Sequence, residues 1–88
     1  MCRNIRTLFN FEPPATADEI QAASLQFVRK VSGYRQPSKV NAAAFDKAIE
    51  EVSHIVGTLL HELVTDRPSL DREVESVKAK ARSAKRFA

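Results

Sequence analysis

Apolar residues recur at three- and four-residue steps through the middle of the chain, which is the spacing of one face of an α-helix. The longest such stripe runs through residues 39–65 and predicts an amphipathic helix there. Its members are Phe45, Ala48, Ile49, Val52, Ile55, Val56, Leu59, Leu60 and Leu63. Ser38 or Asn41 can cap the start of this helix. Pro68 closes the segment that follows, because proline cannot continue a helix.

A shorter helix is predicted over residues 17–32. Thr16 and Glu19 have the spacing of a capping box, in which the hydroxyl and the carboxylate each accept a backbone N–H at the helix start. Gly33 can end the helix in the left-handed conformation. The expected inward positions are Ile20, Ala23, Phe27 and Val31.

A third helix is predicted to open at Ser69 or Leu70 and to run towards Ala88. Acidic residues precede basic ones along it, an order that suits the helix dipole. Its apolar stripe is thin and consists of Leu70, Val74, Val77, Ala81 and Ala84. We therefore expect this helix to dock weakly and to fray at its end.

These patterns predict an all-α fold, in which an antiparallel helical hairpin is preceded by a short N-terminal helix or turn and followed by a basic C-terminal helix. The 88 residues allow one domain, divided into residues 1–14, 15–66 and 67–88. The expected core consists of Ile5, Leu8, Phe9, Phe11, Ile20, Ala23, Phe27, Val31, Phe45, Ile49, Val52, Val56, Leu59 and Leu63.

Composition narrows the function classes. Two glycines and no tryptophan argue against a β-sandwich and against Gly-rich phosphate loops. The single cysteine, Cys2, excludes an intrachain disulfide and any zinc site built on paired cysteines. No apolar run approaches the roughly 20 residues that span a bilayer, and no secretory signal is visible. We expect a cytoplasmic protein with no membrane partner.

The net charge of +3 is concentrated at one end, because residues 1–77 carry −2 and residues 78–88 carry +5. Lys78, Arg82, Lys85 and Arg86 are therefore candidate contacts to nucleic-acid phosphates. Such binding would be weak, salt-sensitive and independent of base sequence. A solvated helix end with favourable dipole charges is the alternative interpretation of the same residues.

The predicted loop between the two longer helices is polar. It contains Tyr34, Arg35, Gln36, Ser38 and Lys39. Loops that a rigid hairpin holds in place often carry recognition. This loop is a candidate protein-binding surface, with a plain connector as the alternative.

Chemically reactive residues are few. Cys2 would combine a thiol with a free α-amine if Met1 were removed, which suits nucleophilic or redox chemistry. His54 and His61 are seven residues apart on one helix, a separation of about 10 Å that is too long for one metal ion. We therefore predict no catalytic constellation, no metal site and no cofactor.

The whole chain resembles a known family, and the resemblance is clearest in two N-terminal segments. They are Met1-Cys2-Arg3-Asn4-Ile5-Arg6 and Leu8-Phe9-Asn10-Phe11-Glu12-Pro13-Pro14-Ala15-Thr16. The sequence resembles the small prokaryotic family catalogued as domain of unknown function 2277. That family has no assigned activity, so the resemblance implies no mechanism.

The arrangement from Leu8 to about Leu60 also resembles the J-domain of Hsp70 co-chaperones. The start of its first long helix is matched by Ala15-Thr16-Ala17-Asp18-Glu19-Ile20, and its packing positions by Ala23, Phe27 and Phe45. The His-Pro-Asp tripeptide of that family is missing, and Gln36-Pro37-Ser38 is the nearest equivalent. The resemblance therefore implies a hairpin architecture rather than Hsp70 stimulation.

For function, we expect a non-enzymatic protein-interaction or adaptor module with a protein partner. A nucleic-acid-binding accessory protein that acts through the basic helix is the alternative, and thiol chemistry at Cys2 is the third hypothesis. A homodimer is also possible, because Leu25, Leu60 and Val64 flank the main apolar stripes.

Overall fold

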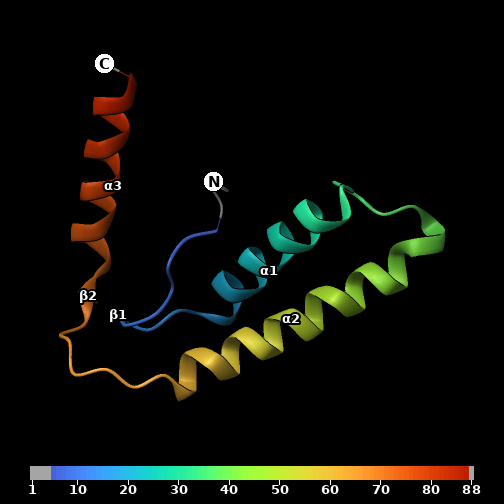
Figure 1. Cartoon of the computed structure of the whole chain (residues 1–88), viewed down its shortest axis with the longest axis horizontal. Helices are drawn as coiled ribbons and strands as arrows, with labels where there is room; N and C mark the ends of the chain where they lie inside the picture. The colour runs from blue at the N-terminus through green and yellow to red at the C-terminus, as the bar shows by residue number, and fades with distance from the viewer. Residues whose placement is uncertain (1–4, 88) are drawn as a thin grey trace.

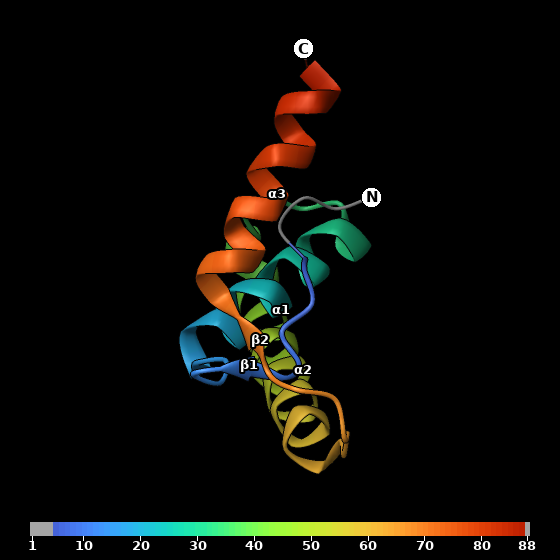
Figure 2. The same ribbon diagram turned by 90° about the vertical axis from the view of Figure 1, so that its left-hand side faces the viewer.

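The computed structural model describes residues 5–87, with the side chains of residues 5–82. The chain forms β1 (Phe11–Glu12), α1 (Ala17–Ser32), the 3₁₀ turn η1 (Lys39–Asn41), α2 (Ala42–Glu62), β2 (Leu70–Asp71) and α3 (Arg72–Phe87). Helices α1 and α2 pack as a hairpin, and α3 leaves that hairpin at one end (Figures 1 and 2). The mostly helical fold with a helical hairpin is therefore confirmed.

The start and end of α1 follow the sequence prediction. The Thr16 hydroxyl accepts the Glu19 backbone N–H at 3.2 Å, and a carboxylate oxygen of Glu19 accepts the Thr16 N–H at 3.0 Å. Gly33 ends the helix with φ 78°, and its N–H donates to the Arg29 carbonyl. Glycine tolerates this left-handed conformation because it has no Cβ.

The other helix starts differ from the predictions. Neither Ser38 nor Asn41 makes a side-chain capping bond, and residues 39–41 form η1 ahead of α2. The third helix begins at Arg72 rather than at Ser69 or Leu70. The Asp71 carboxylate accepts the Val74 N–H at 2.9 Å and so serves as the cap that the prediction placed too early.

The N-terminal segment is a turn that leads into a strand rather than a short helix. β1 pairs in parallel with β2, in the register Phe11 to Leu70 and Glu12 to Asp71. Asn10 precedes the strand with φ 66°, a conformation that asparagine tolerates better than most residues. This small parallel pairing joins two segments almost sixty residues apart, and the sequence pattern gave no sign of it.

The core is smaller than expected. Ser24, Val28 and Phe45 are the buried side chains among the residues that the structure describes. The predicted core residues Ile5, Phe27, Val31, Leu59 and Leu63 are exposed instead. The least exposed row of α1, which we call its contact row, passes through Ser24 and Val28. This row is displaced by one residue position around the helix from the predicted apolar stripe. Ser24 can be buried there because its hydroxyl donates to the Ile20 carbonyl at 2.8 Å.

The molecule is open and flat. Its extents are 44 × 38 × 16 Å and its radius of gyration is 15.5 Å. A compact domain of this length has a radius of gyration of about 12 Å. None of the helices in the described part of the chain is long and apolar enough to cross a membrane.

Candidate protein-interaction surface

A clamp of charged and backbone groups fixes the first turn of α3 against the start of α1. Two guanidinium nitrogens of Arg72 donate to the two carboxylate oxygens of Glu19, each at 2.9 Å. The remaining nitrogen, Nε, donates to the Pro13 carbonyl at 2.8 Å. The guanidinium also lies 5.7 Å from the centre of the Phe11 ring, within cation–π range. Four separate contacts therefore fix the orientation of the Arg72 side chain.

The electrostatics of the clamp follow from these contacts. The hydrogen bonds from Arg72, followed by the backbone hydrogen bond from Thr16, lower the pKa of Glu19 from 4.5 to about 2. The same carboxylate raises the pKa of Arg72 above its ordinary value. Both side chains remain about one third exposed, so water screens their attraction. The clamp thus depends on an ionised Glu19.

Hydrogen bonds of Asn10 support the clamp from the other side. The Leu70 backbone N–H donates to the Asn10 backbone carbonyl at 2.7 Å, and the Asn10 side-chain amide donates to the Pro68 carbonyl at 3.1 Å. Together with the β1–β2 pairing, these bonds fix both ends of the segment that enters α3. The direction of α3 away from the hairpin is therefore set at its first turn (Figure 1).

One side of the hairpin carries an uncovered apolar surface, which we call the hairpin face. It consists of Phe27 and Val31 of α1 and Ile55 and Leu59 of α2, with exposed fractions of 47, 71, 67 and 52%. The less exposed row of α2 runs through Phe45, Val52 and Val56, and on each helix the exposed residues are rotated in the same sense from the less exposed row. Because the helices run antiparallel, both rotations lead to the same side of the hairpin. The hairpin face therefore spans both helices.

Helix α3 presents a second uncovered apolar stripe. Val74, Val77 and Ala81 recur at three- and four-residue steps, and all three are exposed. The sequence of the helix is basic, with a net charge of +4 over residues 72–87. Lys80 and Arg82 are exposed, and Lys78 lies 3.5 Å from Glu75 in an ion pair at helical spacing. Over residues 72–82, whose side chains the structure describes, the apolar side of the helix is thus uncovered.

The interhelical loop lies at the far end of the hairpin from α3 (Figure 1). The side chains of Tyr34, Arg35, Gln36, Ser38 and Lys39 are all exposed there. Local bonds shape the loop: the Tyr34 N–H donates to the Ser32 hydroxyl, and the Asn41 amide donates to that of Ser38, both at 3.1 Å. The loop and the basic helix therefore form two separate surfaces.

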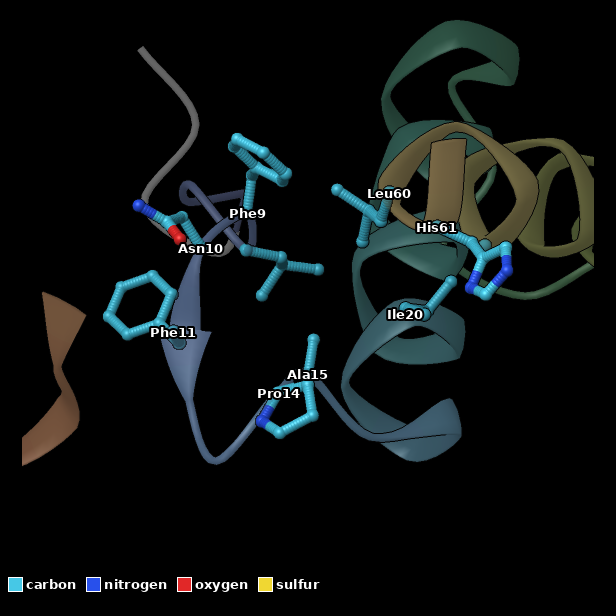
Figure 3. A pocket seen from close by; sticks show the side chains of 10 residues that line it. Phe9, Asn10, Phe11, Pro14, Ala15, Ile20, Leu60 and His61 are labelled. Atoms are coloured by element: carbon cyan, nitrogen blue, oxygen red, sulfur yellow. The ribbon is translucent and has the colours of Figure 1, made fainter. Parts of the chain in front are cut away.

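A cavity of about 400 Å³ separates the N-terminal segment from the end of the hairpin. Figure 3 shows Phe9 and Phe11 on the N-terminal side and Leu60 and His61 on the α2 side. His61 is the one ionisable group among the lining residues, so the cavity brings no acid and base together. Within residues 5–87, no group of three His, Cys, Asp or Glu side chains is placed to hold a metal ion.

Three predicted site residues lie wholly or partly outside the part of the chain that the structure describes. Cys2 lies outside the described residues. Lys85 and Arg86 belong to α3, but their side chains lie beyond those that the structure describes. Lys78 and Arg82 project from the described part of the same helix.

Sequence reasoning missed the pairing of Glu19 with Arg72. One local signal was present: the first turn of a helix disfavours a cation because of the helix dipole, and Arg72 stands there. That anomaly indicates an acidic partner but does not identify it. The capping box already accounts for Glu19 in the sequence, so the sequence gives no reason to expect its ion pair with Arg72.

The chain is similar to a known protein family. A family described as uncharacterized conserved protein (DUF2277) matches residues 1–78. No curated protein and no solved structure matches the chain. The resemblance to J-domains therefore has no support from these comparisons, whereas the resemblance to domain of unknown function 2277 is confirmed.

Proposed function

The chain belongs to the uncharacterized DUF2277 family, and we propose that it is a non-enzymatic protein-interaction module that binds a helix of its partner on the hairpin face. The observation that carries this proposal is the exposure of Phe27, Val31, Ile55 and Leu59 on one side of the hairpin. Exposed apolar side chains on one side of a helix pair are typical of docking sites. A helix that lies on such a face buries its own apolar side there.

The charge of α2 supports a basic partner segment. Residues 42–62 carry four acidic and one basic side chain, a net charge of −3 with neutral histidines. A net acidic helix beside the exposed apolar residues favours a basic amphipathic helix over an acidic one. The proposed partner segment is therefore a helix with an apolar stripe and flanking Lys or Arg residues.

Capture from a lysate of the source cells, with a tagged chain and chemical crosslinking, tests this proposal. Ile55→Asp places a charge on the hairpin face at a side chain that is 67% exposed. We expect this variant to lose most of the captured protein. Val40→Asp makes a matched change at a valine that is 92% exposed, at the loop end of the hairpin, and should capture as wild type does.

A third variant separates the hairpin face from the interhelical loop. Arg35→Glu combined with Lys39→Glu reverses two exposed loop charges and leaves the hairpin face unchanged. Loss of capture in this variant alone would move the interaction to the loop. Equal capture by wild type and by all of the variants would reject the proposed interaction function.

A second candidate function is nucleic-acid binding by α3. It is supported by the exposed side chains of Lys80 and Arg82 on a helix that projects from the hairpin. Fluorescence titration of the full chain with DNA and RNA should show affinity that falls as salt rises, because phosphate binding releases counterions. Replacement of both Lys80 and Arg82 by Glu should reduce that salt dependence. A flat salt response would reject this candidate.

A further inference from the structure

We propose that a second copy of this chain covers the hairpin face, with α3 of each copy lying on the hairpin of the other. The inference rests on the proposed function, since it names the partner of the same surface. The assembly is a symmetric dimer with exchanged C-terminal helices. Its two contacts are equivalent, and each buries the Val74 and Val77 stripe of one copy against the hairpin face of the other.

The chain exposes more surface than a compact monomer does, and the excess matches the area that a dimer interface buries. The chain exposes 7509 Å² of surface. A compact monomer of 9.8 kDa exposes about 5,200 Å². The excess of about 2,300 Å² lies within the range of about 1,000–2,500 Å² that each subunit buries in a permanent homodimer.

Helix α3 also needs a partner for its own stability. A 16-residue helix is marginal in water, because most helical stability in proteins comes from packing an amphipathic side. The clamp at Arg72 prevents α3 from supplying that packing within its own chain. Its first turn is held to Glu19 and Pro13, and from there it runs away from the hairpin (Figures 1 and 2).

The two surfaces match in charge and in length. Helix α3 carries +4, and α2, which supplies half of the hairpin face, carries −3. Both α3 and α1 have 16 residues, about 24 Å of helix, so α3 can run along the hairpin. The opposite net charges of α3 and α2 favour this pairing over contact between two copies of α3, because two basic helices repel each other.

Sedimentation equilibrium of the full-length wild-type chain, from micromolar to millimolar concentration, provides the first test. We expect a species with twice the 9.8 kDa mass of the chain. Ile55→Asp on the hairpin face and Val77→Asp on α3 should each weaken dimerisation about tenfold or more, because each buries a charge at both symmetric contacts. Val40→Asp should dimerise as wild type does.

Mixing the two interface variants distinguishes exchanged helices from other dimers. The Ile55→Asp copy retains an intact α3, and the Val77→Asp copy retains an intact hairpin face. The mixture can therefore form one undamaged contact and should associate more tightly than either variant alone. In a dimer built face to face or α3 to α3, the mixture gives no such rescue.

The outcomes separate this inference from the proposed function. Dimerisation with rescue on mixing supports the exchanged dimer. A wild-type chain that stays monomeric throughout, or a dimer without rescue, overturns it. If the monomeric chain still loses captured protein in the Ile55→Asp variant, the interaction function stands with a different protein as partner. Far-UV circular dichroism of each variant confirms that its helices are formed.

Discussion

The guanidinium of Arg72 donates hydrogen bonds to both carboxylate oxygens of Glu19 at 2.9 Å, although the two residues are 53 positions apart in the sequence. Glu19 simultaneously closes the capping box of α1 by accepting the Thr16 N–H. One carboxylate thus fixes the start of α1 and the direction of α3. This geometry connects helix capping to the uncovered position of the basic helix.

Replacement of Arg72 by lysine should loosen the entry to α3. Lysine keeps the positive charge but cannot form the two parallel bonds to Glu19 or reproduce the Nε bond to Pro13. We expect faster hydrogen exchange at the Leu70 amide, which donates across to Asn10. Arg82→Lys, the same change at an exposed arginine of α3, should leave that exchange rate unaltered. An unchanged Leu70 rate in Arg72→Lys would contradict the role of the clamp.

Stability should fall in acid through Glu19. Because the pKa of Glu19 is about 2 in the folded chain and near 4.5 when unfolded, the unfolded state takes up the proton first as pH falls. The contribution of the clamp is therefore complete above about pH 4.5 and is lost as pH falls towards 2. Urea unfolding at several pH values measures this loss.

The control for this pH dependence is Glu19→Gln, which removes the titrating group at nearly the same size. The difference in unfolding free energy between wild type and variant should be largest above about pH 4.5 and should shrink towards pH 2. A difference that stays constant over this range would show that ionisation of Glu19 does not stabilise the fold.

Loss of the Thr16 hydroxyl should destabilise α1. Thr16→Ala removes the acceptor of the Glu19 N–H and costs about 1 kcal/mol in comparable helix caps. Thr58→Ala makes the same chemical change at an exposed position inside α2, where alanine is the better helix former. Thermal unfolding should therefore show a lower midpoint for the first variant and an equal or higher midpoint for the second.

Two phenylalanines test where the core lies. Phe45 is 8% exposed, so Phe45→Ala should cost about 3–5 kcal/mol, as large-to-small core substitutions do. Phe27 is 47% exposed, so Phe27→Ala should cost much less in a chain kept monomeric by Val77→Asp. Chemical denaturation of both variants in that background decides the point. Equal losses would place Phe27 in the core of the single chain.

The two glycines should respond to alanine in opposite directions. Gly57 lies inside α2 with its nearest neighbour, the Ile20 Cδ1 atom, 4.0 Å from the position of an added Cβ. Alanine fits there, so Gly57→Ala should stabilise the chain by about 0.5–1 kcal/mol. Gly33 has φ 78°, so Gly33→Ala should destabilise it by about 1–2 kcal/mol. Denaturation midpoints that shift in the same direction would contradict this assignment.

Local signals predicted the helices well. The capping box at Thr16, the left-handed glycine at position 33 and the long apolar stripe around Phe45 each act within a few residues, so a single sequence displays them. Two of the four predicted core positions of α1, Phe27 and Val31, are exposed because the partner helix does not cover that part of the apolar stripe, whereas Ile20 and Ala23 are half-buried. Hydrophobicity alone gave no reason to place Ser24 in the contact.

The helices, the hairpin and the charge asymmetry could be predicted from the chain alone, since helix periodicity, caps and net charge are properties of neighbouring residues. The pairing of β1 with β2, the ion pair of Glu19 with Arg72 and the direction of α3 away from the hairpin are visible in the folded molecule alone. These features depend on contacts between segments more than fifty residues apart. Many such pairings are compatible with one sequence, and packing in three dimensions selects among them.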